Sequence, residues 1–247
     1  MLGMSNSLFY AKKLLRHDLH SCLFIGTPRV LAQASYAEFN GDKTLTDLPN
    51  HSIPTGLLLI APAFPTNYSN ILRELNALCH IFDSCPNPTT IHLDDVPLDD
   101  FQYCIESRLV DLLSSNQTSS TRDYIYEACI FAAFLCTYKL STGIWEGCFI
   151  ADFAALKLLG CISQAKHDPR WMQWKELLLW LLIVTGALSR KSSVRAAALV
   201  MIRATFGSTL VGMYDDWEDV QGLSKTFIWS DNAMERHMRR FWEELHE

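Results

Sequence analysis

The chain has 247 residues, of which 49% are hydrophobic and 19% are charged, and its formal net charge at pH 7 is -6. A chain of this length and composition can bury a large core, so we expect a folded globular protein and not a disordered one. The acidic balance is the opposite of the basic surface that is typical of nucleic-acid-binding proteins.

The sequence shows no pattern that is typical of secretion or membrane insertion. The first apolar stretch, residues 8–15, is interrupted by Lys12 and Lys13. The longest apolar run, residues 177–184, is shorter than the roughly 20 residues that a membrane-spanning helix requires. We therefore predict a soluble intracellular protein with no membrane partner.

The eight cysteines are dispersed along the chain, and no two of them form a C-x-x-C pair. Zinc sites need ligands that converge at short spacings, so the pattern predicts neither a metal site nor a cofactor. Cys129 and Cys136 lie seven residues apart and share one face of a predicted helix. We expect them to be buried free thiols, which pack as small hydrophobic side chains.

Residues 1–65 are predicted to form a loop-rich N-terminal segment, with one short helix between Ser5 and His20. From residue 26 to residue 66, five prolines and three glycines interrupt every helical period. The run TGLLLIAPAF, residues 55–64, is bounded by proline and is expected to be extended and packed on the core.

Residues 66–247 are predicted to form a helical domain, because apolar residues recur there at three- and four-residue spacing. The polar stretch SSNQTSS, residues 114–120, is interpreted as a linker, after which Ser120 would cap a central helix with Asp123 at its third position. A later helix is expected to open at Asp168 and Pro169 and to end near Gly186. With no convincing strand pair, the predicted class is all-α, an irregular bundle of about seven to nine helices.

The last 18 residues predict a strongly amphipathic helix. Ser230 is its expected N-cap, and Trp229 and Met234 occupy the two positions of a hydrophobic staple. Its expected core-facing residues are Met234, Met238, Phe241, Trp242 and Leu245. Glu235–Arg239 and Arg240–Glu244 are four residues apart and can pair on the solvated face. The pattern favours a helix docked on the core.

Three stretches in the C-terminal half carry a distinctive pattern of core residues. They are TRDYIYEACIFAAFLCTYKL, WKELLLWLLIVTGALS and WEDVQGLSKTFIWSDNAMERHMRRFWEEL, in chain order. These stretches resemble the fungal-specific transcription factor domain, the helical regulatory region of zinc-cluster transcription factors. The resemblance covers residues 65–247. It implies a nuclear, non-catalytic role in transcriptional regulation, exerted by sensing a small apolar effector, by protein–protein contacts or by dimerisation.

One departure from that family concerns DNA binding. The family's zinc cluster needs six closely spaced cysteines, but Cys22 is the only cysteine among the first 78 residues. We therefore expect no direct DNA contact from this chain. It would be the regulatory part of a longer protein, the product of a truncated gene model, or a stand-alone relative without the DNA-binding arm.

A competing hypothesis is a magnesium-dependent enzyme acting on prenyl diphosphates. Asp215, Asp216 and Asp219 form a D-D-x-x-D motif, and a second acidic cluster lies in residues 94–100. Carboxylates of this kind can hold magnesium ions around a diphosphate. Both clusters also stand where helix N-termini are expected, and acidic residues are favoured there by the helix dipole. We prefer the second interpretation and predict no catalytic residues.

A third hypothesis is a stand-alone module that binds a small molecule or a protein. All-α domains of this size often hold an apolar pocket between helices. The candidate lining residues are Trp171, Met172, Trp174, Trp180, Met201 and Phe206. The simpler interpretation of the same side chains is a packed core. His17 and His20, three residues apart, lack a recognisable third ligand and are predicted to be surface histidines, like His92.

Overall fold

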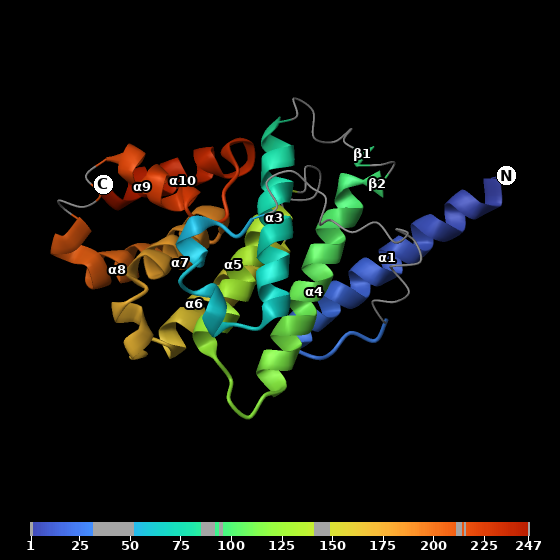
Figure 1. The fold of residues 1–247 in the computed structure, drawn as a ribbon, viewed down its shortest axis with the longest axis horizontal. Helices are drawn as coiled ribbons and strands as arrows, with labels where there is room; N and C mark the ends of the chain where they lie inside the picture. Colours follow the sequence, from blue (N-terminus) through green and yellow to red (C-terminus); the bar gives the residue numbers. More distant parts are fainter. Residues whose placement is uncertain are drawn as a thin grey trace.

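The computed structural model describes residues 2–31, 52–84, 92–93, 96–140, 149–210, 214 and 216–246. In these ranges the protein is helical, and the predicted all-α class is confirmed (Figure 1). The α-helices are α1 (Leu2–Ile25), α3 (Thr66–Ser84), α4 (Leu98–Thr118), α5 (Tyr124–Leu140), α6 (Phe149–Gln164), α7 (Lys175–Leu188), α8 (Ser192–Leu210), α9 (Trp217–Lys225) and α10 (Asp231–His246). Three short 3-10 helices, η2 (Thr55–Leu57), η3 (Ala61–Ala63) and η5 (Pro169–Met172), join them. The two-residue strands β1 (His92–Leu93) and β2 (Val96–Pro97) pair antiparallel.

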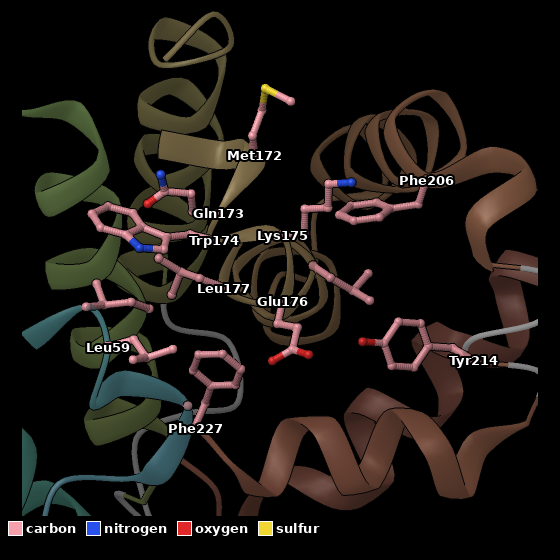
Figure 2. Close-up of a pocket in the computed structure, with 13 residues that line it drawn as sticks. Leu59, Met172, Gln173, Trp174, Lys175, Glu176, Leu177, Phe206, Tyr214 and Phe227 are labelled. Carbon is pink, nitrogen blue, oxygen red and sulfur yellow. The ribbon is translucent and has the colours of Figure 1, made fainter. Parts of the chain in front are cut away.

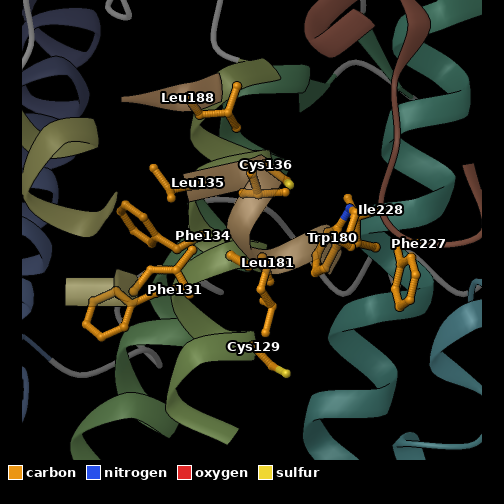
Figure 3. Packing of buried hydrophobic residues seen from close by; sticks show 14 of the residues in the cluster. Cys129, Phe131, Phe134, Leu135, Cys136, Trp180, Leu181, Leu188, Phe227 and Ile228 are labelled. Atoms are coloured by element: carbon orange, nitrogen blue, oxygen red, sulfur yellow. The ribbon is translucent and has the colours of Figure 1, made fainter. Parts of the chain in front are cut away.

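Helices α5 and α7 form the centre of the bundle. Helix α5 packs against α3, α4, α6, α7 and α10, while α7 contacts α5, α6, α8, α9 and α10. All residues of α5 except Tyr124 and Lys139 are buried, as are all residues of α7 from Leu177 onward. Such helices are apolar on every face because neighbours surround them. Figure 3 shows α5 side chains such as Phe134 packed near Leu181 of α7.

The C-terminal helix α10 is docked as the sequence predicts. Its five expected core residues are all buried, namely Met234, Met238, Phe241, Trp242 and Leu245. Ser230 acts as the N-cap, because its Oγ accepts a hydrogen bond from the Ala233 N–H at 3.2 Å. Both predicted surface pairs form, with N–O distances of 3.0 Å for Arg239–Glu235 and 3.7 Å for Arg240–Glu244.

The prediction of an extended segment at residues 55–64 was wrong. This segment forms η2 and η3, in which the Ile60 N–H donates to the Leu57 carbonyl and the Ala63 N–H to the Ile60 carbonyl. The 3-10 turns satisfy these backbone groups locally, and Pro62 suits the first turn of η3. The predicted N-terminal helix is longer than expected and reaches Ile25.

The predicted linker at residues 114–120 was also wrong, because α4 continues to Thr118. Its polar side chains bond to the preceding helical turn: the Ser115 and Thr118 hydroxyls donate to the carbonyls of Asp111 and Ser114. The cap of α5 is Asp123 and not Ser120. Asp123 Oδ1 accepts hydrogen bonds from the N–H groups of residues 125 and 126 at 2.9 and 3.1 Å.

Helix α7 ends at Leu188, near Gly186 as predicted. A Cβ atom at Gly186 would overlap the Phe241 ring, so the missing side chain makes room for this ring of α10. The expected cap at Asp168 is present, but it opens η5, and α7 begins later at Lys175.

Candidate functional site

A cavity of about 350 Å³ opens beside the first turn of α7. Figure 2 shows its walls, which come from η2 and the residues after it, from η5 and α7, from α8, and from both sides of α9. The lining residues are Gly56, Leu59, Ile60, Met172, Gln173, Trp174, Lys175, Glu176, Leu177, Leu179, Phe206, Tyr214 and Phe227. The cavity is therefore mostly apolar with a few polar groups, which is typical of small-molecule sites.

Close backbone contacts fix one wall of the cavity. The Gly56 N–H donates to the Thr226 carbonyl at 2.7 Å, which ties η2 to the turn after α9. A Cβ atom at Gly56 would lie 2.6 Å from Thr226 Oγ1 and 2.9 Å from Phe227 Cζ. Phe227 in turn stacks on the buried Trp180 ring, with centroids 5.0 Å apart. These contacts hold the Phe227 ring at the cavity wall.

Two apolar side chains stand exposed at the cavity. Leu59 is 87% exposed and Met172 is 77% exposed, although both belong to segments packed on the core. Single large apolar side chains scattered over a protein surface are common and need no explanation. Exposed apolar side chains grouped beside an apolar cavity, by contrast, indicate a binding surface. They leave apolar surface available to a ligand.

Four polar side chains line the cavity without a partner in the described ranges. Gln173, Lys175 and Glu176, which are exposed, and the half-buried Tyr214 make no side-chain hydrogen bond or ion pair there. Figure 2 shows the Tyr214 hydroxyl pointing toward the Glu176 carboxylate, while the Lys175 amine points to the other side, beside Phe206. The pKa of Tyr214 is raised by burial and, to a lesser extent, by the negative charges of Glu176 and Asp219.

In a second cavity, of about 290 Å³, the polar groups at the wall are hydrogen-bonded to one another and to Arg170. This cavity lies between η3, the end of α4 and the start of α5. The Asn116 side chain bonds to the backbone of Asp123, and the Asp123 carboxylate accepts hydrogen bonds from Arg170 at 2.6 and 3.0 Å. Because these groups already have protein partners, the first cavity is the better candidate site.

The sequence identified some residues of this site. Of the six predicted lining residues, Met172, Trp174 and Phe206 line the cavity. Trp180 lies in the core, and the buried Trp171 donates from Nε1 to the Ala165 carbonyl at 2.9 Å. Met201 is not part of the lining. Sequence reasoning missed Leu59, Tyr214 and Phe227, because no local pattern links segments so far apart in the chain. It also missed Glu176, which is close to Trp174 in the chain but is not one of the aromatic and methionine residues that were considered.

The aspartate motif is placed at the start of α9. Asp216 is the N-cap, and its Oδ1 accepts a hydrogen bond from the Asp219 N–H at 3.0 Å. Asp215, Asp94 and Asp95 lie outside the described residues. Within the described ranges, no three His, Cys, Asp or Glu side chains converge as metal ligands would. The carboxylate of Asp216 therefore has a structural role at a helix N-terminus.

The predictions for the thiols are confirmed, and those for the histidines are confirmed only in part. Cys129 and Cys136 are buried free cysteines, as expected, and burial raises the pKa of each thiol. His17 is exposed as predicted, but His20 is partly buried, with its ring 6.5 Å from that of Tyr138. The prediction for His20 was wrong because α1 packs on the bundle along that face. The His92 side chain lies outside the described residues.

Comparison with known proteins adds no relative: family models, curated proteins and solved structures all give no match. In the part of the chain that the structure describes, each helix is too short or too polar to cross a lipid bilayer.

Proposed function

We propose that this chain is a non-catalytic regulatory domain of the fungal-specific transcription factor type, and that it senses a small apolar effector. In this proposal the effector binds in the cavity beside the first turn of α7, and the domain acts in the nucleus through a protein partner or a second copy of itself.

The observation that supports this proposal is the combination of an apolar cavity with unpaired polar groups at its wall. An apolar wall supplies binding energy, and a few polar side chains orient the ligand. Leu59, Met172 and Phe206 offer apolar surface, while Glu176 and Tyr214 have no protein partner in the described ranges. The resemblance of the C-terminal half to the regulatory family supplies the biological role.

The cavity test uses a pair of matched substitutions. Leu59→Trp should fill the cavity without affecting the core, because Leu59 is already exposed. Leu156→Trp places the same side chain at an exposed position of α6 that does not line the cavity. We expect small apolar metabolites to raise the melting temperature of the wild type and of Leu156→Trp, but not that of Leu59→Trp.

The regulatory role is tested by fusing the chain to an unrelated DNA-binding domain in yeast and measuring a reporter gene. A compound that stabilises the purified protein should change reporter output, and Leu59→Trp should remove that response. If no apolar metabolite stabilises the protein, or if stabilising compounds leave the reporter unchanged in every variant, the proposal is wrong.

A further inference from the structure

We infer that the cavity selects a ligand with an apolar body and a protonated amine, and that the amine lies between Glu176 and the aromatic side chains. This inference rests on the proposed function and adds the chemical class of the effector. It follows from the placement of charge and of aromatic rings around the cavity.

The first argument concerns the negative charge at one end of the cavity. The Glu176 carboxylate has no ion pair or hydrogen bond among the described residues, and the Tyr214 hydroxyl points toward it (Figure 2). Asp219 lies near enough to Tyr214 to affect its pKa. A bound amine would give this carboxylate a charged partner.

Two arginines on neighbouring segments are paired within the protein. Arg170, a few residues before Glu176, binds Asp123 and Asp168, with shortest N–O distances of 2.6 and 2.7 Å. Arg195 binds Glu244 at 2.6 Å. Glu176 is exposed and lines the cavity without such a partner in the described ranges, so its carboxylate is accessible to a ligand.

The second argument concerns the aromatic lining. Four aromatic side chains border the cavity and come from different segments, namely Trp174, Phe206, Tyr214 and Phe227. Aromatic faces carry negative electrostatic potential and attract cations, most strongly where water is displaced. Arg170 already lies over the Trp174 ring at 5.5 Å, and Phe227 stacks on Trp180. The rings of Tyr214 and Phe206 are therefore the ones that can face an ammonium group.

Lys175 does not cancel this preference. Its amine points to the opposite side of the cavity from Glu176, beside Phe206 (Figure 2), and the two neighbouring residues form no ion pair. The free N–H groups of the first turn of α7 favour an acceptor near the helix axis. Glu176 belongs to this same turn, so its carboxylate lies at the end of α7 where a negative charge is favoured.

The cavity volume limits the size of the ligand. About 350 Å³ is near the lower end of the range of small-molecule sites. A bicyclic aromatic body with a short amine chain is of suitable size.

The experiment compares three probes with the same ring system: naphthylethylamine, naphthylethanol and naphthylacetate. Binding to the purified full chain is measured by isothermal titration calorimetry at neutral pH. We expect the amine to bind about tenfold more tightly than the alcohol and the acid to bind most weakly. Glu176→Gln should abolish the difference between amine and alcohol, and Tyr214→Phe should reduce it.

Two controls make the result specific. Glu243→Gln removes an exposed carboxylate of α10 outside the cavity and should leave the amine preference unchanged. Circular dichroism spectra establish that each variant is folded.

The outcomes separate this inference from the proposed function. If amine and alcohol bind equally, or if the acid binds most tightly, the ligand class is wrong while the cavity remains a binding site. If Glu176→Gln keeps the full preference, the assigned carboxylate is wrong. If none of the three probes binds, the ligand class is wrong, and the proposed function is decided separately by the melting temperatures of the wild type and Leu59→Trp with apolar metabolites.

Discussion

Asp83, at the end of α3, caps α10 from 147 residues away through Ser230. The Ser230 hydroxyl donates to Asp83 Oδ1 at 2.6 Å. The backbone N–H groups of Asp231 and Asn232 donate to the same carboxylate at 2.9 and 3.0 Å. One side chain thus satisfies two of the free N–H groups at the start of α10 and also orients its N-cap serine.

Replacing Asp83 with alanine should lower the free energy of unfolding by about 2–3 kcal/mol, because three hydrogen bonds to a charged group are lost. The measurement is urea denaturation followed by circular dichroism. Ser84→Ala is the matched control, since the Ser84 hydroxyl donates only to the His80 carbonyl of its own helix. Equal losses for the two variants would contradict the capping role.

Gly186→Ala should destabilise the protein by about 3 kcal/mol or more, because its Cβ would overlap the Phe241 ring. Gly160→Ala and Gly222→Ala are helical controls with no atom within 4 Å of the added Cβ. They should be neutral or raise stability by about 0.5–1 kcal/mol, because alanine is the better helix former. Thermal unfolding of the three variants distinguishes overlap from helix propensity.

The sequence predicted those parts of the fold that depend on local periodicity. The core face of α10 follows a spacing of three and four residues, so the pattern alone assigns Met234, Phe241 and Leu245 to the interior. The same applies to α5 and α7, whose continuous apolar sequences indicate burial on all sides. Local patterns, however, do not identify which helix covers which face.

Contacts between distant segments could not be predicted. Asp83 caps α10, and Asp152 of α6 similarly accepts hydrogen bonds from the N–H groups of Arg190 and Lys191 before α8, at 2.7 and 3.2 Å. The candidate site also depends on distant segments, because Leu59 and Tyr214 come to line one cavity only after folding. The polar stretch at 114–120 suggests a linker because serine and threonine are common in loops, but the hydroxyls of Ser115 and Thr118 bond to α4 carbonyls.

The carboxylate of Glu127 is buried in the bundle, with 1% of the side chain exposed. Arg122 binds it through two hydrogen bonds of 2.7 Å, and the Gln117 amide donates a third at 2.8 Å. Arg122→Met should cost about 3 kcal/mol, because it leaves a buried charge without its cation. Chemical denaturation at neutral pH measures this loss.

The double variant Arg122→Met, Glu127→Leu should recover part of the stability lost by Arg122→Met alone, because an apolar pair removes the need to bury a charge. If the double variant loses more free energy of unfolding than the two single variants lose together, the pair has a role beyond charge compensation.

Two partly buried histidines predict a loss of stability in mild acid. The pKa of His237 is lowered from 6.5 to about 4 by burial and then by Lys139 and nearby arginines, the largest of them Arg236. The pKa of His20 is also lowered to about 4, by burial and then by Arg16. Between pH 4 and pH 6.5 the unfolded chain binds more protons than the folded chain, so stability rises with pH in this window.

The wild type should therefore be less stable at about pH 5 than at about pH 7, and His237→Gln should show a smaller difference, because glutamine does not titrate. Urea denaturation at the two pH values gives the comparison. His237 is surrounded mainly by cations, since Lys139, Arg195 and Arg240 all act on it. The Glu244 carboxylate is paired with Arg195. A protonated His237 would thus add a positive charge to a cationic environment. If the pH dependence of stability is unchanged in His237→Gln, other groups control stability in mild acid.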